Sequence, residues 1–148
     1  MRQCNTIDDL IDTAHDHLST ISPRGIAAFW SLLVKHVQNH RGENSRVQLN
    51  EQLTEILCYT IENIKGYSYR DISTIAISLA KIMKQVESRG QSADTSSLHR
   101  ILHDLLIGGD NSENKQYLFS EIAGHATPIL SKFDARSLSN LIYSYGHA

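Results

Sequence analysis

The same helix start occurs three times in this sequence. The three stretches are residues 21–36, 67–82 and 133–148, which read ISPRGIAAFWSLLVKH, YSYRDISTIAISLAKI and FDARSLSNLIYSYGHA. Each begins with a bulky apolar residue and a Ser or Asp, and an arginine stands two positions after that Ser or Asp. An internal repeat of this kind restricts the fold strongly, because every copy has to adopt a similar local structure.

The three stretches are predicted to be amphipathic helices. Ser22, Ser68 and Asp134 are good N-cap residues, since a side-chain oxygen can accept a hydrogen bond from a free backbone N–H of the first turn. The apolar residue before each cap and the Ile or Leu four positions after it form a hydrophobic staple. Apolar residues also stand seven, eight and eleven positions after each cap, which is the period of a helix with a broad apolar face. These residues are Phe29, Trp30 and Leu33, then Ile75, Ala76 and Leu79, then Leu141, Ile142 and Tyr145.

A second amphipathic helix is predicted before each of these three. The preceding helices cover residues 6–21, 49–66 and 113–130, and Pro128 should shorten or kink the last one. We therefore expect an all-α protein in which paired helices stack as a short α-solenoid. The expected single domain is 1–148, with units at about 6–37, 49–86 and 113–148 and an extra helix at 96–108. The alternative is a plain helical bundle whose helices share the same pattern.

The recurring arginine is not explained by helix propensity. Arg24, Arg70 and Arg136 stand at the second helical position, where a cation meets the positive end of the helix dipole. One structural explanation is an ion pair with a carboxylate of a neighbouring helix, and another is an aliphatic stem that covers apolar surface. Coincidence is a third. The functional explanation is a ladder of guanidinium groups along one edge of the solenoid, which meets phosphates or stacked bases.

Two further positions of the repeat are candidates for nucleic-acid contacts. Six residues after the caps stand Ala28, Thr74 and Asn140, and repeat proteins that read one RNA base per unit use small or polar positions of this kind. The alternative is a solvent-facing position without a role. Lys35 and Lys81 both lie thirteen residues after their caps and add positive charge. The candidate RNA-binding residues are therefore Arg24, Arg70, Arg136, Lys35, Lys81, Thr74 and Asn140.

Composition and motifs argue against enzymatic chemistry. The two cysteines have no metal or redox spacing, and the histidine pairs His36/His40 and His99/His103 supply too few ligands for zinc, so they are expected on the surface. No phosphate-binding glycine loop and no nucleophile motif occurs. We therefore expect no catalytic residues, no metal, no cofactor and no small-molecule substrate. The net charge of −2 disfavours indiscriminate binding to phosphate backbones, but it allows a local basic stripe.

Signals for membranes or organelles are also missing from the sequence. No apolar run approaches the roughly 18 residues that a membrane span requires, so no membrane partner is expected. The first twenty residues hold four aspartates and one arginine, whereas transit peptides are rich in arginine and poor in acidic residues. No targeting peptide is therefore visible.

The segments IDDLIDTAHDHLSTISPRGIAAFWSLLVKH, YSYRDISTIAISLAKI and FDARSLSNLIYSYGHA resemble the α-helical repeats of octotricopeptide-repeat and FAST-kinase-like proteins. The shared phrase is apolar–S/D–x–R–x–apolar–S/A–x–apolar, and the loops and residues 96–108 fit it least. The resemblance implies an RNA-binding solenoid that acts in mitochondria or chloroplasts, in transcript stability, processing, translation or ribosomal RNA maturation. This chain differs from the family in its longer repeat spacing, in having no RAP domain and in showing no targeting peptide. These differences are expected of a fragment of a longer protein or of an incomplete gene model.

Two functions remain open at this point. The first is a non-enzymatic protein that binds single-stranded RNA, which requires the three arginines to be exposed along one surface. The second is a protein–protein interaction scaffold, in which the arginines would be paired with carboxylates and an apolar groove would be exposed elsewhere.

Overall fold

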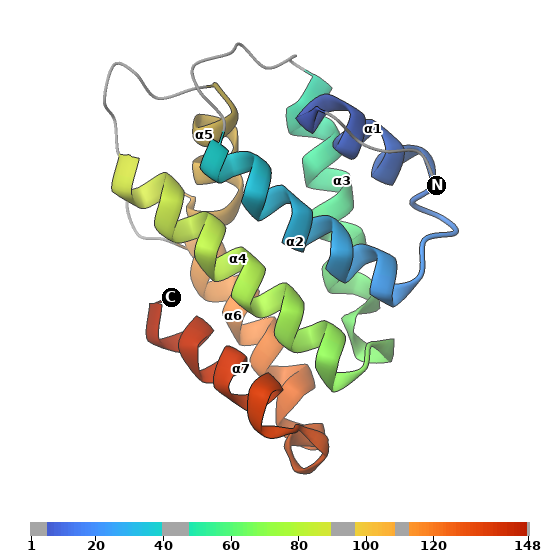
Figure 1. Ribbon diagram of the computed structural model, residues 1–148, viewed down its shortest axis with the longest axis vertical. Coiled ribbons are helices and arrows are strands. Elements are labelled where there is room, and N and C mark those ends of the chain that lie inside the picture. The colour runs from blue at the N-terminus through green and yellow to red at the C-terminus, as the bar shows by residue number, and fades with distance from the viewer. Residues whose placement is uncertain (1–5, 40–47, 90–96, 109–112, 148) are drawn as a thin grey trace.

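The computed structural model describes residues 6–39, 48–89, 97–108 and 113–147, and these residues form helices without any strand (Figure 1). The all-α prediction is therefore confirmed. Three of the α-helices end in, or continue as, a 3₁₀ or π-helical segment. The elements in chain order are α1 (Ile7–Asp16), α2 (Pro23–Asn39), α3 (Gln48–Asn63), η1 (Ile64–Gly66), α4 (Tyr69–Arg89), α5 (Ser97–Leu102), η2 (His103–Ile107), α6 (Glu113–Ala126), η3 (Thr127–Lys132) and α7 (Ala135–His147).

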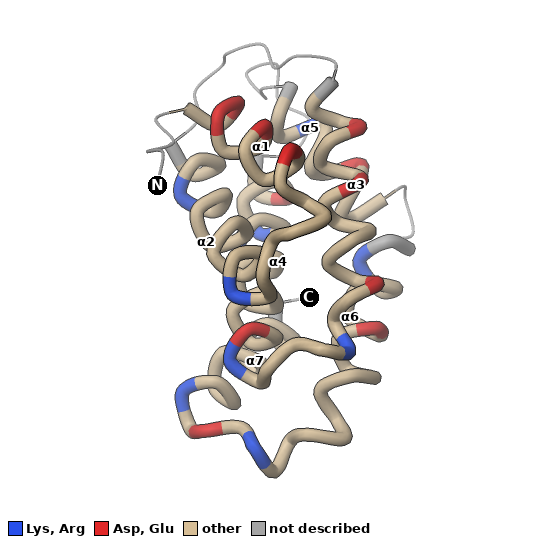
Figure 2. Tube along the Cα trace, turned by 90° about the vertical axis from the view of Figure 1, so that its right-hand side faces the viewer, with Lys and Arg blue, Asp and Glu red and all other residues tan. Residues whose placement is uncertain are grey.

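The helices α2, α4 and α7 lie side by side and run in the same direction, with α4 in the middle and packed against both neighbours (Figure 1). We call these three helices the front layer. Each follows one of the helices α1, α3 and α6 in the chain, which we call the preceding helices. The helices α3 and α6 lie behind the front layer and run in the opposite direction, whereas α1 packs against both α2 and α3 at one end (Figures 1 and 2).

The front-layer helices begin where the cap residues predict. The Ser22 Oγ accepts a hydrogen bond from the backbone N–H of the third helical residue at 3.0 Å, and the Ser68 Oγ accepts the equivalent bond at 3.2 Å. The Asp134 Oδ1 accepts the third such bond at 2.7 Å. All three caps are thus confirmed, and each satisfies a backbone donor that has no partner inside its own helix. The helix α6 ends at Ala126, two residues before Pro128, as the loss of a backbone donor at proline requires.

The apolar face of the front layer is buried in two copies of the repeat and only partly in the third. Phe29, Ile75 and Leu141, seven residues after the caps, are all buried. The prediction is wrong for Ile142 and Tyr145, which are 64% and 37% exposed. Their physical surroundings differ, because α4 has a front-layer neighbour on each side, whereas α7 has α4 on one side and no described helix on the other.

Two other sequence expectations can be compared with the described residues. His99 was expected at the surface but is buried, because its short helix α5 packs against α4. His40 lies outside the described residues. No helix in the described ranges combines the length and the hydropathy that crossing a membrane requires.

Candidate nucleic-acid interface on the front layer

The three recurring arginines are exposed at the starts of three parallel, neighbouring helices. Arg24, Arg70 and Arg136 occupy the same place relative to the caps of α2, α4 and α7. None of them forms a salt bridge with a residue that the structure describes. A direct salt bridge to a neighbouring helix is therefore not seen within the described ranges, although the charge of Arg70 acts on Asp134, the cap of α7.

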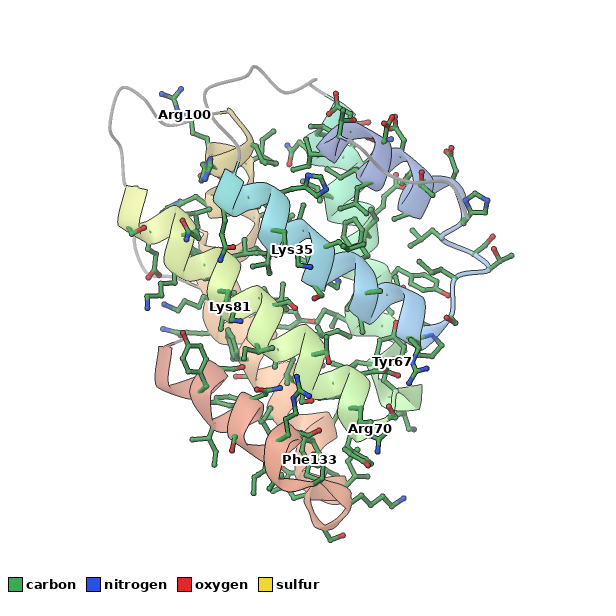
Figure 3. The ribbon with its side chains drawn as sticks, viewed as in Figure 1. Lys35, Tyr67, Arg70, Lys81, Arg100 and Phe133 are labelled. Atoms are coloured by element: carbon green, nitrogen blue, oxygen red, sulfur yellow. The ribbon has the colours of Figure 1, made fainter. Side chains whose placement is uncertain are left out.

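Exposed lysines lie further along the same face. Lys35 on α2 and Lys81 on α4 point outward from the front of the layer (Figure 3). Each follows the arginine of its own helix by eleven residues, which corresponds to about 16 Å along a helix at ~1.5 Å per residue. Sequence reasoning missed Lys84, which is also exposed and follows Lys81 by three residues, a spacing that places both on one helix face.

The positions between the two groups of cations are uncharged. Thr74 and Asn140, six residues after their caps, are half-buried, and Ala28 at the same position of α2 is exposed. A helix turns by about 100° per residue, so positions two, six, nine and thirteen after the cap share one side. The face therefore presents arginines at one end, neutral side chains in the middle and lysines toward the other end.

Charge is segregated between the two sets of helices (Figure 2). Among described side chains, the front layer carries six Lys or Arg and two Asp or Glu, whereas the preceding helices carry eight Asp or Glu and one lysine. That lysine, Lys115, donates a hydrogen bond at 2.8 Å to Glu87, one of the two front-layer carboxylates. A chain with a small negative net charge thus has one distinctly positive face. The six front-layer cations are Arg24, Lys35, Arg70, Lys81, Lys84 and Arg136.

An aromatic pair lies beside the arginines at one end of this face. The rings of Tyr69 and Phe133 have centroids 5.7 Å apart, and the Arg70 guanidinium carbon is 5.6 Å from the Tyr69 centroid. Figure 3 labels Arg70 and Phe133 at this end of the face. Both aromatic side chains are half-buried. A partly exposed ring next to arginines is a typical stacking place for an unpaired base. Sequence reasoning did not find this pair, because Phe133 was assigned only to the hydrophobic staple.

One carboxylate lies close to the aromatic pair. The pKa of Asp134 is lowered, first by the hydrogen bond from the Ser137 backbone N–H and to a smaller degree by the positive charges of Arg70 and Arg136. Both guanidinium groups act on Asp134 through their charge, but neither lies within salt-bridge distance of a described carboxylate.

A different feature lies on the side of the preceding helices. A cavity of about 250 Å³ opens between α3, η2 and α6, and its lining is mostly apolar. It holds one thiol, Cys58, and one carboxylate, Glu62, which do not make a catalytic set. Within the described ranges, no group of three or more His, Cys, Asp or Glu is placed to hold a metal ion.

Comparisons of the chain with protein-family models, with curated proteins and with solved structures found no match. The function is therefore inferred from the charged face and its surroundings.

Proposed function

We propose that this protein binds single-stranded RNA through the front layer and catalyses no reaction. The observation that carries the proposal is the set of six exposed cations on one face, none of which is salt-bridged to a described residue. Cations that are free of internal partners can neutralise phosphates and release condensed counterions, which is the main source of affinity for nucleic acids. Acidic side chains on the preceding helices repel a polyanion from those surfaces.

A strand that crosses the three front-layer helices would meet Arg24, Arg70 and Arg136 in succession. Neighbouring helices pack about 8–10 Å apart, so two such steps span roughly 16–20 Å. The bases of the strand would then lie over the neutral strip, where Thr74 and Asn140 offer hydrogen bonds. At the arginine end, the pair of Tyr69 and Phe133 offers a surface on which a base can stack.

We also propose that the fold is an α-solenoid and that the protein acts in organellar RNA metabolism. The three repeated caps and the parallel front layer support an assignment of the helix pairs as units of an α-solenoid. The resemblance to octotricopeptide and FAST-kinase-like repeats supports a role in RNA metabolism inside mitochondria or chloroplasts.

A protein–protein interaction scaffold is the second candidate function. Two observations favour a scaffold. The first is the apolar cavity between α3, η2 and α6, and the second is the set of exposed apolar residues on α7. The exposed arginines favour RNA, since a scaffold gives no reason to keep them free of salt bridges to described residues. The two functions predict different effects of charge reversal on the front layer.

Fluorescence anisotropy with a labelled pool of single-stranded RNA tests the first function. The triple variant R24E/R70E/R136E is compared with the wild-type protein and with K65E/R100E/K132E. The control variant reverses the same number of exposed cations, all outside the front layer. We expect wild-type binding to weaken with salt, and each lost phosphate contact to reduce the slope of log K against log salt by about 0.7.

Loss of binding in the front-layer variant, with binding kept in the control variant, would support the proposal. Equal affinities of both variants would show that binding depends on overall charge alone and would contradict it. A folded wild-type protein that binds no RNA at low salt would also contradict it and would favour the scaffold.

A further inference from the structure

The side of α7 that faces away from α4 is apolar and exposed. Ile142 is 64% exposed, and Leu138 and Tyr145 are 38% and 37% exposed. The residues at the same distances from the caps of α2 and α4 are all at most 1% exposed; they are Ile26, Trp30, Leu33, Ile72, Ala76 and Leu79. An apolar face that is covered in two copies of the repeat thus lies open in the third.

In α2 the position equivalent to Ile142 is covered by the next helix in the chain, since the Trp30 Nε1–H donates to the Thr60 hydroxyl of α3 at 3.0 Å. On α7, the residues Ser137, Leu141 and Ser144 are buried, and the centre of this buried side lies roughly 130° around the helix from Ile142. On the central helix α4 both sides are buried, since Ala76, which corresponds to Ile142, is 0% exposed. The open face of α7 is therefore the counterpart of a surface that neighbouring helices cover in the other two copies of the repeat.

We propose that a second copy of this chain covers the open face, with the two α7 helices antiparallel about a two-fold axis at Ile142. The proposal does not depend on RNA binding. A two-fold interface brings the same surface of both copies together. A residue that stands a given number of positions before Ile142 in one copy therefore lies opposite the residue that stands the same number of positions after Ile142 in the other.

The open face is complementary to itself in this arrangement. With Ile142 on the axis, Leu138 of one copy lies opposite Gly146 of the other, and Tyr145 lies opposite Ser139. Each large side chain therefore meets a small residue, as close helix packing requires. A Cβ atom added at Gly146 would have no atom within 4 Å in the single chain, so there is free space to receive Leu138 of the second copy. Tyr145 is held in place by its hydroxyl, which donates to the Phe119 carbonyl at 2.7 Å.

The charges at the ends of α7 also favour the antiparallel arrangement. Arg136 lies in the first turn of α7, where its cation opposes the helix dipole. In the antiparallel pair it approaches the C-terminal end of the other α7, which carries the negative end of the dipole. This favourable interaction between two copies offsets the unfavourable one that remains within each copy.

A head-to-tail assembly through α2 is less compatible with the structure. The outer end of the layer beside α2 is already occupied by α1, which packs against both α2 and α3. Phe29, on the side of α2 that corresponds to the α4-facing side of α7, is 3% exposed. The helix α1 carries four aspartates, so this end of the layer presents a polar, acidic surface.

Sedimentation velocity over a range of protein concentrations tests the proposal. We expect the wild-type chain to form a dimer, and Ile142→Glu to weaken it by at least about 100-fold, because two carboxylates would face each other on the axis. Leu32→Glu is the matched control, since Leu32 is a 43% exposed leucine on α2 at the other end of the layer. It should leave the dimer unchanged. Gly146→Leu is a second test and should also weaken the dimer, because the leucine fills the space for Leu138 of the second copy without a clash inside the single chain.

Disulfide cross-linking gives an independent readout of the two-fold axis. In a variant with Cys4 and Cys58 changed to serine, Ile142→Cys should form a disulfide-linked dimer under mild oxidation, whereas Leu32→Cys should not. A wild-type chain that stays monomeric up to about 100 µM would overturn the proposal. A dimer that Leu32→Glu dissociates as strongly as Ile142→Glu, or one that fails to cross-link through position 142, would overturn it as well.

Discussion

Replacing the three front-layer arginines with glutamate should stabilise the fold while it removes RNA binding. A carboxylate in the first turn of a helix contributes about 0.3–1 kcal/mol, and a cation there costs a similar amount. At Arg24 the full exchange applies. At Arg70 it is reduced by the loss of the cation–π contact with Tyr69, which is worth about 0.5 kcal/mol at an exposed site. At both Arg70 and Arg136 the new carboxylate would also repel Asp134, the cap of α7.

The three sites together should therefore raise the free energy of unfolding by about 1 kcal/mol, which is a rise of roughly 2–4 °C in the melting temperature of a domain of this size. Thermal unfolding followed by circular dichroism at low ionic strength measures the change. Replacement by glutamine separates the two contributions, because it removes the cation without adding the anion. A fall in melting temperature of several degrees would refute the reasoning and would show that the arginines stabilise the fold through local contacts.

Two pairs of substitutions test the hydrogen bonds of the core. Thr60→Val should lower the free energy of unfolding by about 1–3 kcal/mol, because the buried Trp30 Nε1–H donates to the Thr60 hydroxyl at 3.0 Å. The control Thr54→Val, on the exposed side of the same helix, should change the free energy of unfolding by less than about 0.5 kcal/mol. At pH 7, Tyr67→Phe should leave stability unchanged or raise it, since the buried Tyr67 hydroxyl has no hydrogen-bond partner among the described residues; Tyr145→Phe should lower it by about 1 kcal/mol. Burial raises the pKa of Tyr67 from 10.0 to about 12, so the unfolded chain loses this proton first and the folded chain loses stability as the pH rises from 10 toward 12. In urea unfolding, wild type should therefore lose more stability than Tyr67→Phe over that interval, and equal losses would contradict this.

The features that the sequence predicted correctly are local ones. A cap depends on one side chain and on a backbone N–H three residues away, so Ser22, Ser68 and Asp134 could be assigned without knowledge of the fold. The end of α6 before Pro128 is local for the same reason. The exposure of the arginines could not be predicted, because it depends on which carboxylates the neighbouring helices bring close.

The features that were missed depend on neighbours in space. Ile142 and Trp30 occupy the same repeat position, yet one is exposed and the other buried, because only α2 has a following helix packed on that side. His99 has the spacing of a surface histidine, but it is buried in a short helix that packs against α4. The pair of Tyr69 and Phe133 comes from residues that are 64 positions apart in the chain and meet only when α4 and α7 lie side by side.

The segregation of charge explains how a chain with a net charge of −2 could still bind a polyanion. Net charge alone disfavours a polyanion, but attraction and repulsion at a surface depend on the charges within about one Debye length, roughly 8–10 Å at physiological salt. If RNA binds, the front-layer cations act on it at short range, and the acidic α1 and α3 lower the affinity of every other approach. The preceding helices then orient the strand as well as support the front layer. Neutralising the aspartates of α1 should therefore increase RNA binding in incorrect orientations. It should also reduce the difference in RNA affinity between the wild-type protein and the arginine variant. An unchanged difference in affinity would show that the front layer alone decides where RNA binds.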